Sequence, residues 1–154
     1  MEAAAEADHT DLANSMLDPW SRALGLRFTR VTLDAIEAEI ALGPQHLQGF
    51  GIVHGGVYAS VVETLCSVGA GVTSLPRGMS VAGLENHTTF LRAVRGGTLR
   101  ACATPLTRGR RTQVWETTIT GEDGKLVAKG SVRLICLPLG SDLAGAPIEL
   151  PPHG

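Results

Sequence analysis

The sequence predicts a single α+β domain, in which an antiparallel sheet of about six strands curls around one long central helix. The first observation is a nearly all-apolar helical stretch from about His54 to Ser74, which a glycine pair opens. The second is its surroundings, because two segments of alternating polarity precede it and four further strand segments follow. The third is size, since 154 residues with 44% hydrophobic content fit one domain with a full core.

The part of the chain before the sheet is predicted to hold little structure. Residues 1–10 are expected to be disordered, and residues 11–24 place apolar side chains at helical spacing around Pro19, which predicts a broken helix. The predicted divisions are an N-terminal disordered segment with a short helix over 1–24, the main domain over 25–137 and a flexible C-terminal tail over 138–154.

Two strands precede the long helix as a hairpin. They are expected at Leu26–Leu33 and Ala35–Leu42, joined around Leu33 and Asp34. A glycine-containing loop over Gly43–Val53 leads into the helix, which Pro76 and Gly78 end. The four later strands are predicted at Met79–Leu91, Gly97–Thr107, Thr112–Thr120 and Leu126–Leu137, separated by turn signals.

Glu63 is the one charged residue inside the apolar helix. An ionised carboxylate is costly to bury alone, so such groups are normally paired, protonated or used in chemistry. A polar stripe accompanies it at helical spacing, formed by Ser60, Glu63, Thr64 and Ser67. Two interpretations stay open: the stripe is the wall of a site, or Glu63 is merely hydrogen-bonded to a neighbouring hydroxyl.

The start of the helix is the second candidate feature. Gly55 and Gly56 follow His54 at the point where the apolar run begins, and the first N–H groups of a helix have no partner within it. Glycine allows close approach of a ligand, and the helix dipole favours negative charge, which together suit an oxyanion hole. A plain glycine-rich turn is the alternative.

Composition excludes several classes of function. The formal net charge of −2 gives no reason to expect nucleic acid or a membrane surface as a partner. The three cysteines lack C-x-x-C spacing, and no secretory signal or membrane-length uncharged run is visible, so a soluble cytoplasmic protein is expected. The histidines lack zinc-site spacing and no glycine-rich phosphate loop is present, so neither a metal nor a cofactor is expected.

Three stretches carry a family resemblance: G-I-V-H-G-G-V-Y-A-S-V-V-E-T at 51–64, N-H-T-T-F-L-R at 86–92, and the strand pair around Trp115. With them, residues 25–137 resemble the hotdog-fold acyl-CoA thioesterases of the phenylacetate-degradation type, most closely the 4-hydroxybenzoyl-CoA thioesterases of the Arthrobacter kind. The predicted layout of a sheet curled around one helix is this hotdog architecture. The resemblance implies hydrolysis of an acyl-CoA, and we expect an aryl or short to medium acyl group.

The resemblance also implies roles for individual residues. In that family the acid attacks the thioester or activates water, the second residue of H-G-G donates its N–H to the carbonyl oxygen, and an upstream glutamine helps to polarise it. These roles fall on Glu63, Gly55 and Gln48. A hydroxyl one turn past the acid, here Ser67, commonly orients the acid or the water. His54 is a candidate base, although the resemblance implies that it mainly shapes the loop.

Substrate contacts can be assigned in the same way. The family holds coenzyme A, as part of its substrate, on arginines near the sheet edge and on a loop between late strands. The matching positions are Arg92, Arg110, Arg111 and Thr112. Candidates for an acyl pocket are Phe50, Tyr58, Leu84 and Phe90, while Asn86 and His87 either line that pocket or satisfy buried backbone groups.

The spacing of Gly55 and Glu63 predicts that two chains form each site. Eight residues of helix separate them by roughly 12 Å, whereas both must come within about 3 Å of one thioester. A two-fold axis that sets the helices antiparallel would bring Gly55 of one chain opposite Glu63 of the other. We therefore expect a homodimer with shared sites, paired into a homotetramer.

Two other functions remain as alternatives. A hotdog enoyl-CoA hydratase or dehydratase would need a histidine and an acid that cooperate, but His54 and Glu63 are badly spaced for this on one chain. A non-catalytic acyl-CoA binding module would keep the fold without chemistry, but it gains nothing from a buried acid.

Overall fold

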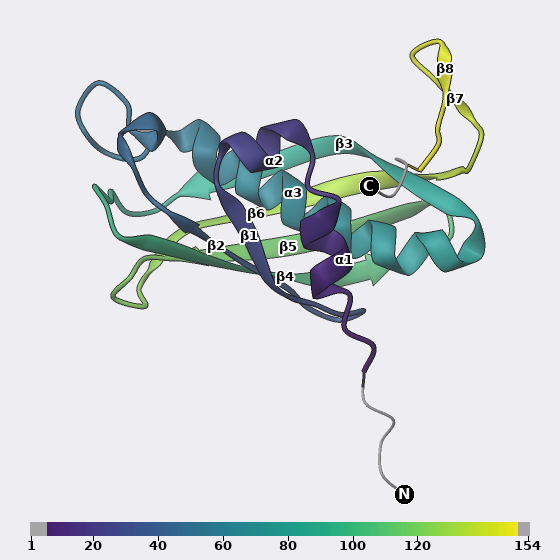
Figure 1. Cartoon of the computed structure of the whole chain (residues 1–154), viewed down its shortest axis with the longest axis horizontal. Coiled ribbons are helices and arrows are strands. Elements are labelled where there is room, and N and C mark those ends of the chain that lie inside the picture. The colour runs from purple at the N-terminus through teal and green to yellow at the C-terminus, as the bar shows by residue number, and fades with distance from the viewer. Residues whose placement is uncertain (1–5, 151–154) are drawn as a thin grey trace, which may run out of the picture.

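The computed structural model describes residues 6–150, which form one long helix, two short helices and a main sheet (Figure 1). The helices are α1 (Thr10–Ser15), α2 (Pro19–Ala23) and α3 (Gly55–Ser74), with 3₁₀ turns η1 (Pro44–His46) and η2 (Leu75–Arg77). The strands are β1 (Leu26–Val31), β2 (Ile36–Ala41), β3 (Met79–Phe90), β4 (Thr98–Arg108), β5 (Thr112–Thr120), β6 (Leu126–Pro138), β7 (Asp142–Leu143) and β8 (Ala146–Pro147).

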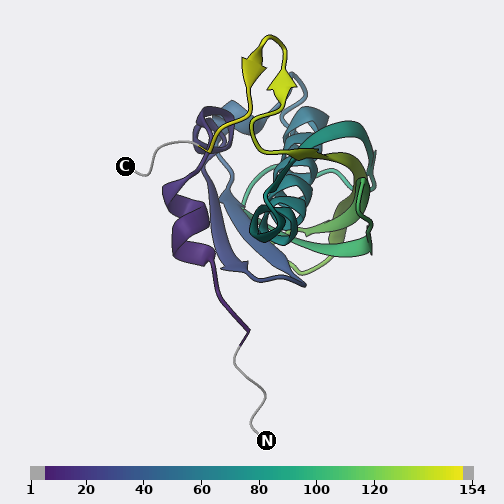
Figure 2. The same ribbon diagram turned by 90° about the vertical axis from the view of Figure 1, so that its right-hand side faces the viewer.

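The main sheet has six strands in the order β1-β2-β4-β5-β6-β3, and every neighbouring pair is antiparallel. The view along the helix shows the sheet curling around α3 (Figure 2). Strands β2 and β5 alternate between buried and more exposed residues, because one face of each packs on α3 and the other faces outward. The predicted hotdog layout is therefore confirmed.

The helix lies very close to the sheet because of a glycine. Gly69 faces the indole of Trp115 on β5, and a Cβ at this position would lie 2.5 Å from the ring. Trp115 is fully buried, as are Val62 and Leu65 on the same helix. The core is therefore built on the contact between α3 and the middle strands, with no room between them.

A buried polar network secures the last turns of α3. Gln113 on β5 donates from Nε2 to Ser74 Oγ at 2.8 Å and accepts from Trp115 Nε1 at 2.9 Å. All three residues are fully buried. Each polar group of the network thus finds a partner, which a buried polar group requires.

A buried histidine holds the loop before α3. The Nδ1 atom of His46 accepts from Gly43 N at 2.9 Å, and its Nε2 lies 2.8 Å from the carbonyl oxygen of Leu24, to which it donates. The carbonyl of His46 then accepts from His54 N at 2.9 Å. His46 therefore links His54, the N-cap residue of α3, to the segment that precedes β1.

Strand β3 is an open edge of the sheet. It pairs only with β6, and none of its twelve residues is buried. Leu84 and Phe90 are large apolar side chains on this strand with 51% and 56% of their surface exposed. A long exposed edge strand of this kind is a ready surface for pairing with another chain.

The chain ends differ from the expectation in detail. The predicted disorder falls partly on residues 1–5, outside the described residues, but His9 N already donates to Val31 O at 2.8 Å. The break at Pro19 is confirmed, because Pro19 begins α2 behind its cap Asp18. The predicted tail contains the β7–β8 hairpin, whose turn places Ala144 at a φ of 55°; residues 151–154 lie outside the described part.

Among residues 6–150, one segment is long and apolar enough to cross a membrane by length and composition alone, namely Gly55–Arg77. It comprises α3 and η2, and α3 is the helix around which the sheet curls. Its apolar character is thus accounted for by the core of the fold.

Glycine substitutions on α3 test the close approach of helix and sheet. Gly69→Ala should lower the free energy of unfolding by about 1–3 kcal/mol, because the buried ring of Trp115 has no space to move away from the new methyl group. Gly71→Ala is the matched control on the same helix, since nothing lies within 4 Å of the place its methyl group would occupy. It should raise the free energy of unfolding by about 0.5–1 kcal/mol. Equal effects in urea unfolding would contradict the packing argument.

Candidate active site

Glu63 lies half-buried on α3, where it faces β3. Its Oε2 accepts from Asn86 Nδ2 at 3.0 Å, and the same amide nitrogen donates to the carbonyl of Ala59 at 3.0 Å. Gly83 lies opposite the other oxygen, Oε1, which would collide with any Cβ at that position. Within residues 6–150 no hydrogen bond reaches Oε1. Glu63 is therefore held at one oxygen and free at the other, and its partner is an amide from β3 rather than a neighbouring hydroxyl of the helix.

The predicted polar stripe along α3 serves two different neighbours. Ser60 Oγ accepts from Trp20 Nε1 at 2.9 Å, and Thr64 Oγ1 lies 3.1 Å from Ser21 Oγ, so both hydroxyls bind α2. Ser67 is half-buried one turn past Glu63, and among the described residues its hydroxyl makes no hydrogen bond. Only Glu63 and Ser67 of the stripe remain available to a ligand.

Asn86 is a partner of Glu63 that the sequence did not predict, although Asn86 was expected either to line the acyl pocket or to satisfy buried backbone groups. It sits three residues after Gly83, and strict alternation along a strand would turn the two to opposite faces. The pairing of β3 with β6 shifts between Gly83 and Glu85, however, which is a bulge. The bulge turns both positions toward Glu63. Thr88 Oγ1 donates to Asn86 Oδ1 at 2.7 Å and fixes the orientation of the amide.

The start of α3 leaves one backbone donor unused. The ring of His54, the N-cap residue, accepts from Gly56 N at 2.8 Å, and Val57 N donates to the carbonyl of His54 at 2.9 Å. Among the described residues the N–H of Gly55, the first residue of the helix, has no acceptor. The arrangement agrees with His54 shaping the helix start, and its Nδ1 atom is already engaged there.

A hollow of about 300 Å³ opens beside this donor and brings several predicted residues together. It is lined by Gln48, Ile52, Val53, Gly55, Tyr58, Phe90, Leu91, Arg92 and Ala93. The ring of Phe90 lies against Gly55, at a distance that leaves no space for a Cβ there. Gln48 Oε1 accepts from Phe50 N, which orients its amide within the loop.

The predicted coenzyme A contacts lie at two separate places. Arg92 lines the Gly55 hollow and binds Asp123 through both terminal nitrogens, at 2.9 and 2.7 Å. This hydrogen bonding from Arg92 lowers the pKa of Asp123. Arg110, Arg111 and Thr112 form the β4–β5 turn, near the other end of β3, because Thr112 pairs with Ile135, which pairs with Ala82. Arg92 lies ten positions after Ala82, beyond the far end of β3, so one chain does not bring the two groups together.

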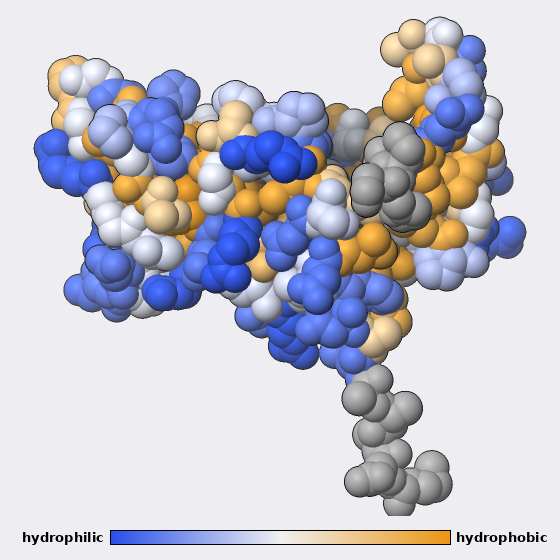
Figure 3. All heavy atoms as spheres, in the orientation of Figure 1, coloured by the Kyte–Doolittle hydropathy of each residue, from blue (hydrophilic) through white to orange (hydrophobic). Residues whose placement is uncertain are grey.

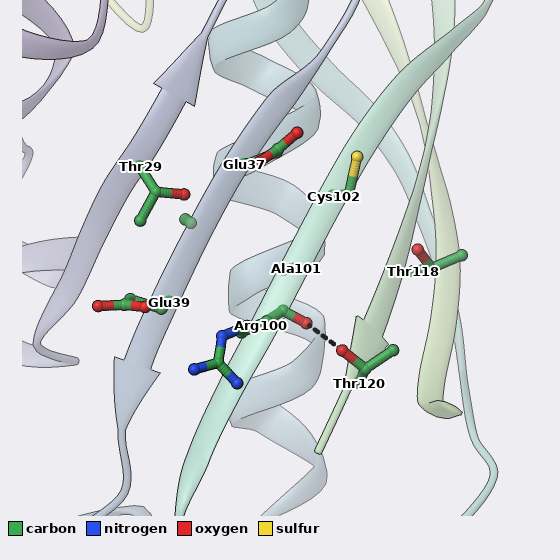
Figure 4. A pocket seen from close by; sticks show the side chains of 9 residues that line it. Thr29, Glu37, Glu39, Arg100, Ala101, Cys102, Thr118 and Thr120 are labelled. Atoms are coloured by element: carbon green, nitrogen blue, oxygen red, sulfur yellow. Dashed lines mark hydrogen bonds between the residues drawn. The ribbon is translucent and has the colours of Figure 1, made fainter. Parts of the chain in front are cut away.

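Two further hollows contain none of the predicted catalytic residues. One of about 380 Å³ crosses the outer face of the sheet, where Glu37, Glu39, Arg100 and Cys102 point away from α3 (Figure 4). Burial raises the pKa of the Cys102 thiol, so this cysteine is no ready nucleophile. The other, of about 520 Å³, lies between α1 and the later turns of α3, where apolar side chains gather on the surface (Figure 3).

The described part of the chain holds no cluster of side chains that could bind a metal ion. Across residues 6–150 no three side chains of His, Cys, Asp or Glu come together as a metal site. Cys66 is buried beside Thr117, and burial raises the pKa of its thiol to about 11. It therefore stays protonated at neutral pH and packs as a core residue.

Comparisons with known proteins identify the family of the chain. The family model described as the thioesterase superfamily matches residues 50–128, a stretch that contains Gly55, Glu63, Asn86 and Arg92. A Mycobacterium tuberculosis protein named as an esterase is 42% identical over 118 residues, covering 75% of this chain and 84% of the relative. The proofreading thioesterase EntH of Cronobacter turicensis is 38% identical over 102 residues, which cover 66% of this chain and 74% of that protein.

Solved structures resemble the fold over most of the chain. The solved structure of the same Mycobacterium tuberculosis protein has a TM-score of 0.77 at 40% identity, covering 79% of this chain and 98% of the other. A thioesterase structure from Haemophilus influenzae has a TM-score of 0.77 at 32% identity, covering 86% and 90%. The chain belongs to the thioesterase superfamily and has the hotdog fold of these enzymes; membership of this family supports thioester hydrolysis.

The position of Glu63 depends on Asn86, and this dependence is testable. Asn86→Ala removes the donor at Oε2 and should lower kcat for thioester hydrolysis about tenfold or more, because a small displacement of a reacting group is costly. The change in the free energy of unfolding should be far smaller than the change in activation free energy that the lower kcat represents. Glu85→Gln is the control on the same strand, since Glu85 only makes an exposed ion pair with Arg133 at 3.4 Å. A kcat equal in both variants would show that Asn86 does not position Glu63.

Proposed function

We propose that the protein hydrolyses acyl-CoA thioesters, with an aryl or a short to medium acyl group, to the free acid and CoA. The observation that supports this most is the pair of unused groups: the Gly55 N–H at the start of a helix and the Glu63 Oε1 beside β3. The first is a donor suited to a developing oxyanion, and the second is a carboxylate oxygen suited to attack or proton transfer. Thioester hydrolysis that relies on a carboxylate uses both.

In the proposed reaction the thioester carbonyl oxygen accepts from the Gly55 N–H, with the amide of Gln48 nearby. Glu63 either attacks the carbonyl carbon, forming a mixed anhydride that water then hydrolyses, or takes a proton from the water that attacks. In both routes the carbon–sulfur bond breaks and the electron pair leaves on sulfur as CoA thiolate, which takes up a proton. The thiolate is a good leaving group, so the proposal includes neither a metal nor a cofactor.

We further propose that the active unit is a homodimer formed through the open edge of β3. Gly55 touches Phe90 at one end of β3, whereas Glu63 touches Gly83 nearer the other. An antiparallel pair of β3 strands would set Phe90 of one chain opposite Gly83 of the other if the two-fold axis passed midway, between Asn86 and His87. Each Glu63 would then face the partner's helix start.

The same pairing accounts for the separated arginines. Since Arg92 follows one end of β3 and the Arg110–Thr112 turn lies near the other, an antiparallel dimer would bring Arg92 of one chain toward the turn of its partner. Both groups would then be available to one CoA. Pairing of two dimers into a homotetramer and a cytoplasmic location complete the proposal.

The choice of acyl group rests on the apolar side chains near the two halves of the site. Phe90 and Leu84 are half-exposed on β3, whereas Phe50 projects into solvent with 85% of its surface exposed. The similarity to the 4-hydroxybenzoyl-CoA thioesterases favours an aryl group. The proofreading thioesterase named above further supports a thioester substrate.

Thiol release from a panel of aryl- and acyl-CoA thioesters tests the reaction and its key residue together. Wild type should turn over at least one thioester, and Glu63→Gln should lose at least about 100-fold in kcat, because removing a catalytic acid or base typically costs this much. Glu85→Gln serves as the control for a lost surface carboxylate. CoA binding without turnover by wild type would instead favour a binding module, and hydration of an enoyl-CoA would favour a hydratase.

A further inference from the structure

Tyr58 is a buried residue whose hydroxyl has no partner. Its side chain is 3% exposed and belongs to the core, yet within residues 6–150 its Oη makes no hydrogen bond. Burial raises the pKa of this phenol, partly opposed by the nearby charge of Arg92, so it remains a neutral donor. Buried tyrosine hydroxyls normally find a partner, so this one points to a group that binds there.

A second unpaired donor lines the same hollow. Arg92 uses its two terminal nitrogens on Asp123, and among the described residues its Nε is buried without a partner. Tyr58 and Arg92 both line the hollow of about 300 Å³ that also contains Gly55 and Gln48. Two residues with an unpaired buried donor thus lie in the wall of one cavity beside the proposed thioester site.

The geometry of α3 directs the phenol toward the helix start. Tyr58 follows Gly55 by three residues, which is about 4.5 Å along the axis. Side chains of a helix lean toward its N-terminus, so the ring of Tyr58 projects back along the same face as Gly55. Its ring packs against the ring of Phe90, with centroids 5.8 Å apart. Tyr58 therefore lies at the base of the hollow and does not form an outer wall against which an acyl group would pack.

The electrostatics of the hollow favour an uncharged acceptor. The bidentate pair with Asp123 offsets the charge of Arg92, and the phenol is neutral. The remaining walls are largely apolar, including Val53, Phe90 and Leu91. A carbonyl oxygen satisfies two donors in such a place without the desolvation cost of a phosphate or a carboxylate.

We propose that Tyr58 Oη and Arg92 Nε bind the amide carbonyl of the substrate's thiol arm, two methylene groups beyond the thioester sulfur. This inference rests on the proposed function, because it assumes the thioester carbonyl at Gly55. The substrate class is then a thioester of a pantetheine-type thiol, and a simple alkyl thioester lacks the group that these donors bind. Tyr58 acts as a specificity residue for the thiol half of the substrate.

Two thioesters of one acid test the proposal with wild type and Tyr58→Phe. The N-acetylcysteamine thioester carries the amide, and the propanethiol thioester lacks it. On the N-acetylcysteamine thioester, Tyr58→Phe should lose about tenfold in kcat/KM, which is the scale of one hydrogen bond. On the propanethiol thioester, the loss should be at most about one fifth of that. The melting temperature of Tyr58→Phe should not fall, since the variant removes only an unpaired hydroxyl. An equal loss on both thioesters, or no loss on either, would overturn the proposal and leave a tyrosine that binds water.

Binding of reduced pantetheine, measured by calorimetry, separates this inference from the proposed function. Tyr58→Phe should weaken binding about tenfold, whereas Glu63→Gln should bind pantetheine as wild type does. Tyr58-dependent binding without any thioester hydrolysis would retain the inference and refute the proposed function. Glu63-dependent hydrolysis with an unchanged pantetheine Kd in Tyr58→Phe would retain the proposed function and refute the inference. Acyl-CoA and an acylated carrier protein both present a pantetheine-type arm. The one that wild type hydrolyses with the higher kcat/KM is identified as the source of the arm.

Discussion

The close contact between α3 and the sheet is the constraint on which the rest of the structure depends. A Cβ at Gly69 would collide with Trp115, and a Cβ at Gly83 would collide with Glu63. The helix therefore has one position relative to the strands. That position sets the carboxylate against β3 and the helix start against Phe90, so the packing of the core determines the geometry of the candidate site.

The polar groups of the molecule fall into two sets. Those that support the fold are satisfied, as in the network of Gln113 with Ser74 and in the two hydrogen bonds of the His46 ring. Four groups near the candidate site have no partner in the described part of the chain, and they lie along α3 and at the end of β3: Gly55 N, Tyr58 Oη, Glu63 Oε1 and Arg92 Nε. Unpaired donors and acceptors are costly unless something binds them, and here they gather where a substrate and a second chain would meet.

Much of the fold follows from periodicity in the sequence. The apolar run predicts α3, the alternation predicts the strands to within one or two residues, and Glu63 stands out because a lone acid in such a helix needs a reason. Asn86 could not be assigned this way, because the bulge after Gly83 changes the face of the strand. Tyr58 looks like any core aromatic in the sequence, since its unpaired hydroxyl depends on three-dimensional contacts. The distance between Arg92 and Arg111 likewise follows from strand order, which local patterns do not encode.

The central claim is that each site takes Gly55 from one chain and Glu63 from the other. Gly55→Pro removes the free N–H at the first helical position, where proline is otherwise tolerated, and Gly55→Ala controls for the displaced ring of Phe90. A heterodimer purified through two different tags would combine one Gly55→Pro chain with one Glu63→Gln chain. With shared sites, one site carries both changes and the other neither, so the heterodimer should recover about half of the wild-type kcat. A heterodimer as inactive as the two parent variants would contradict the account.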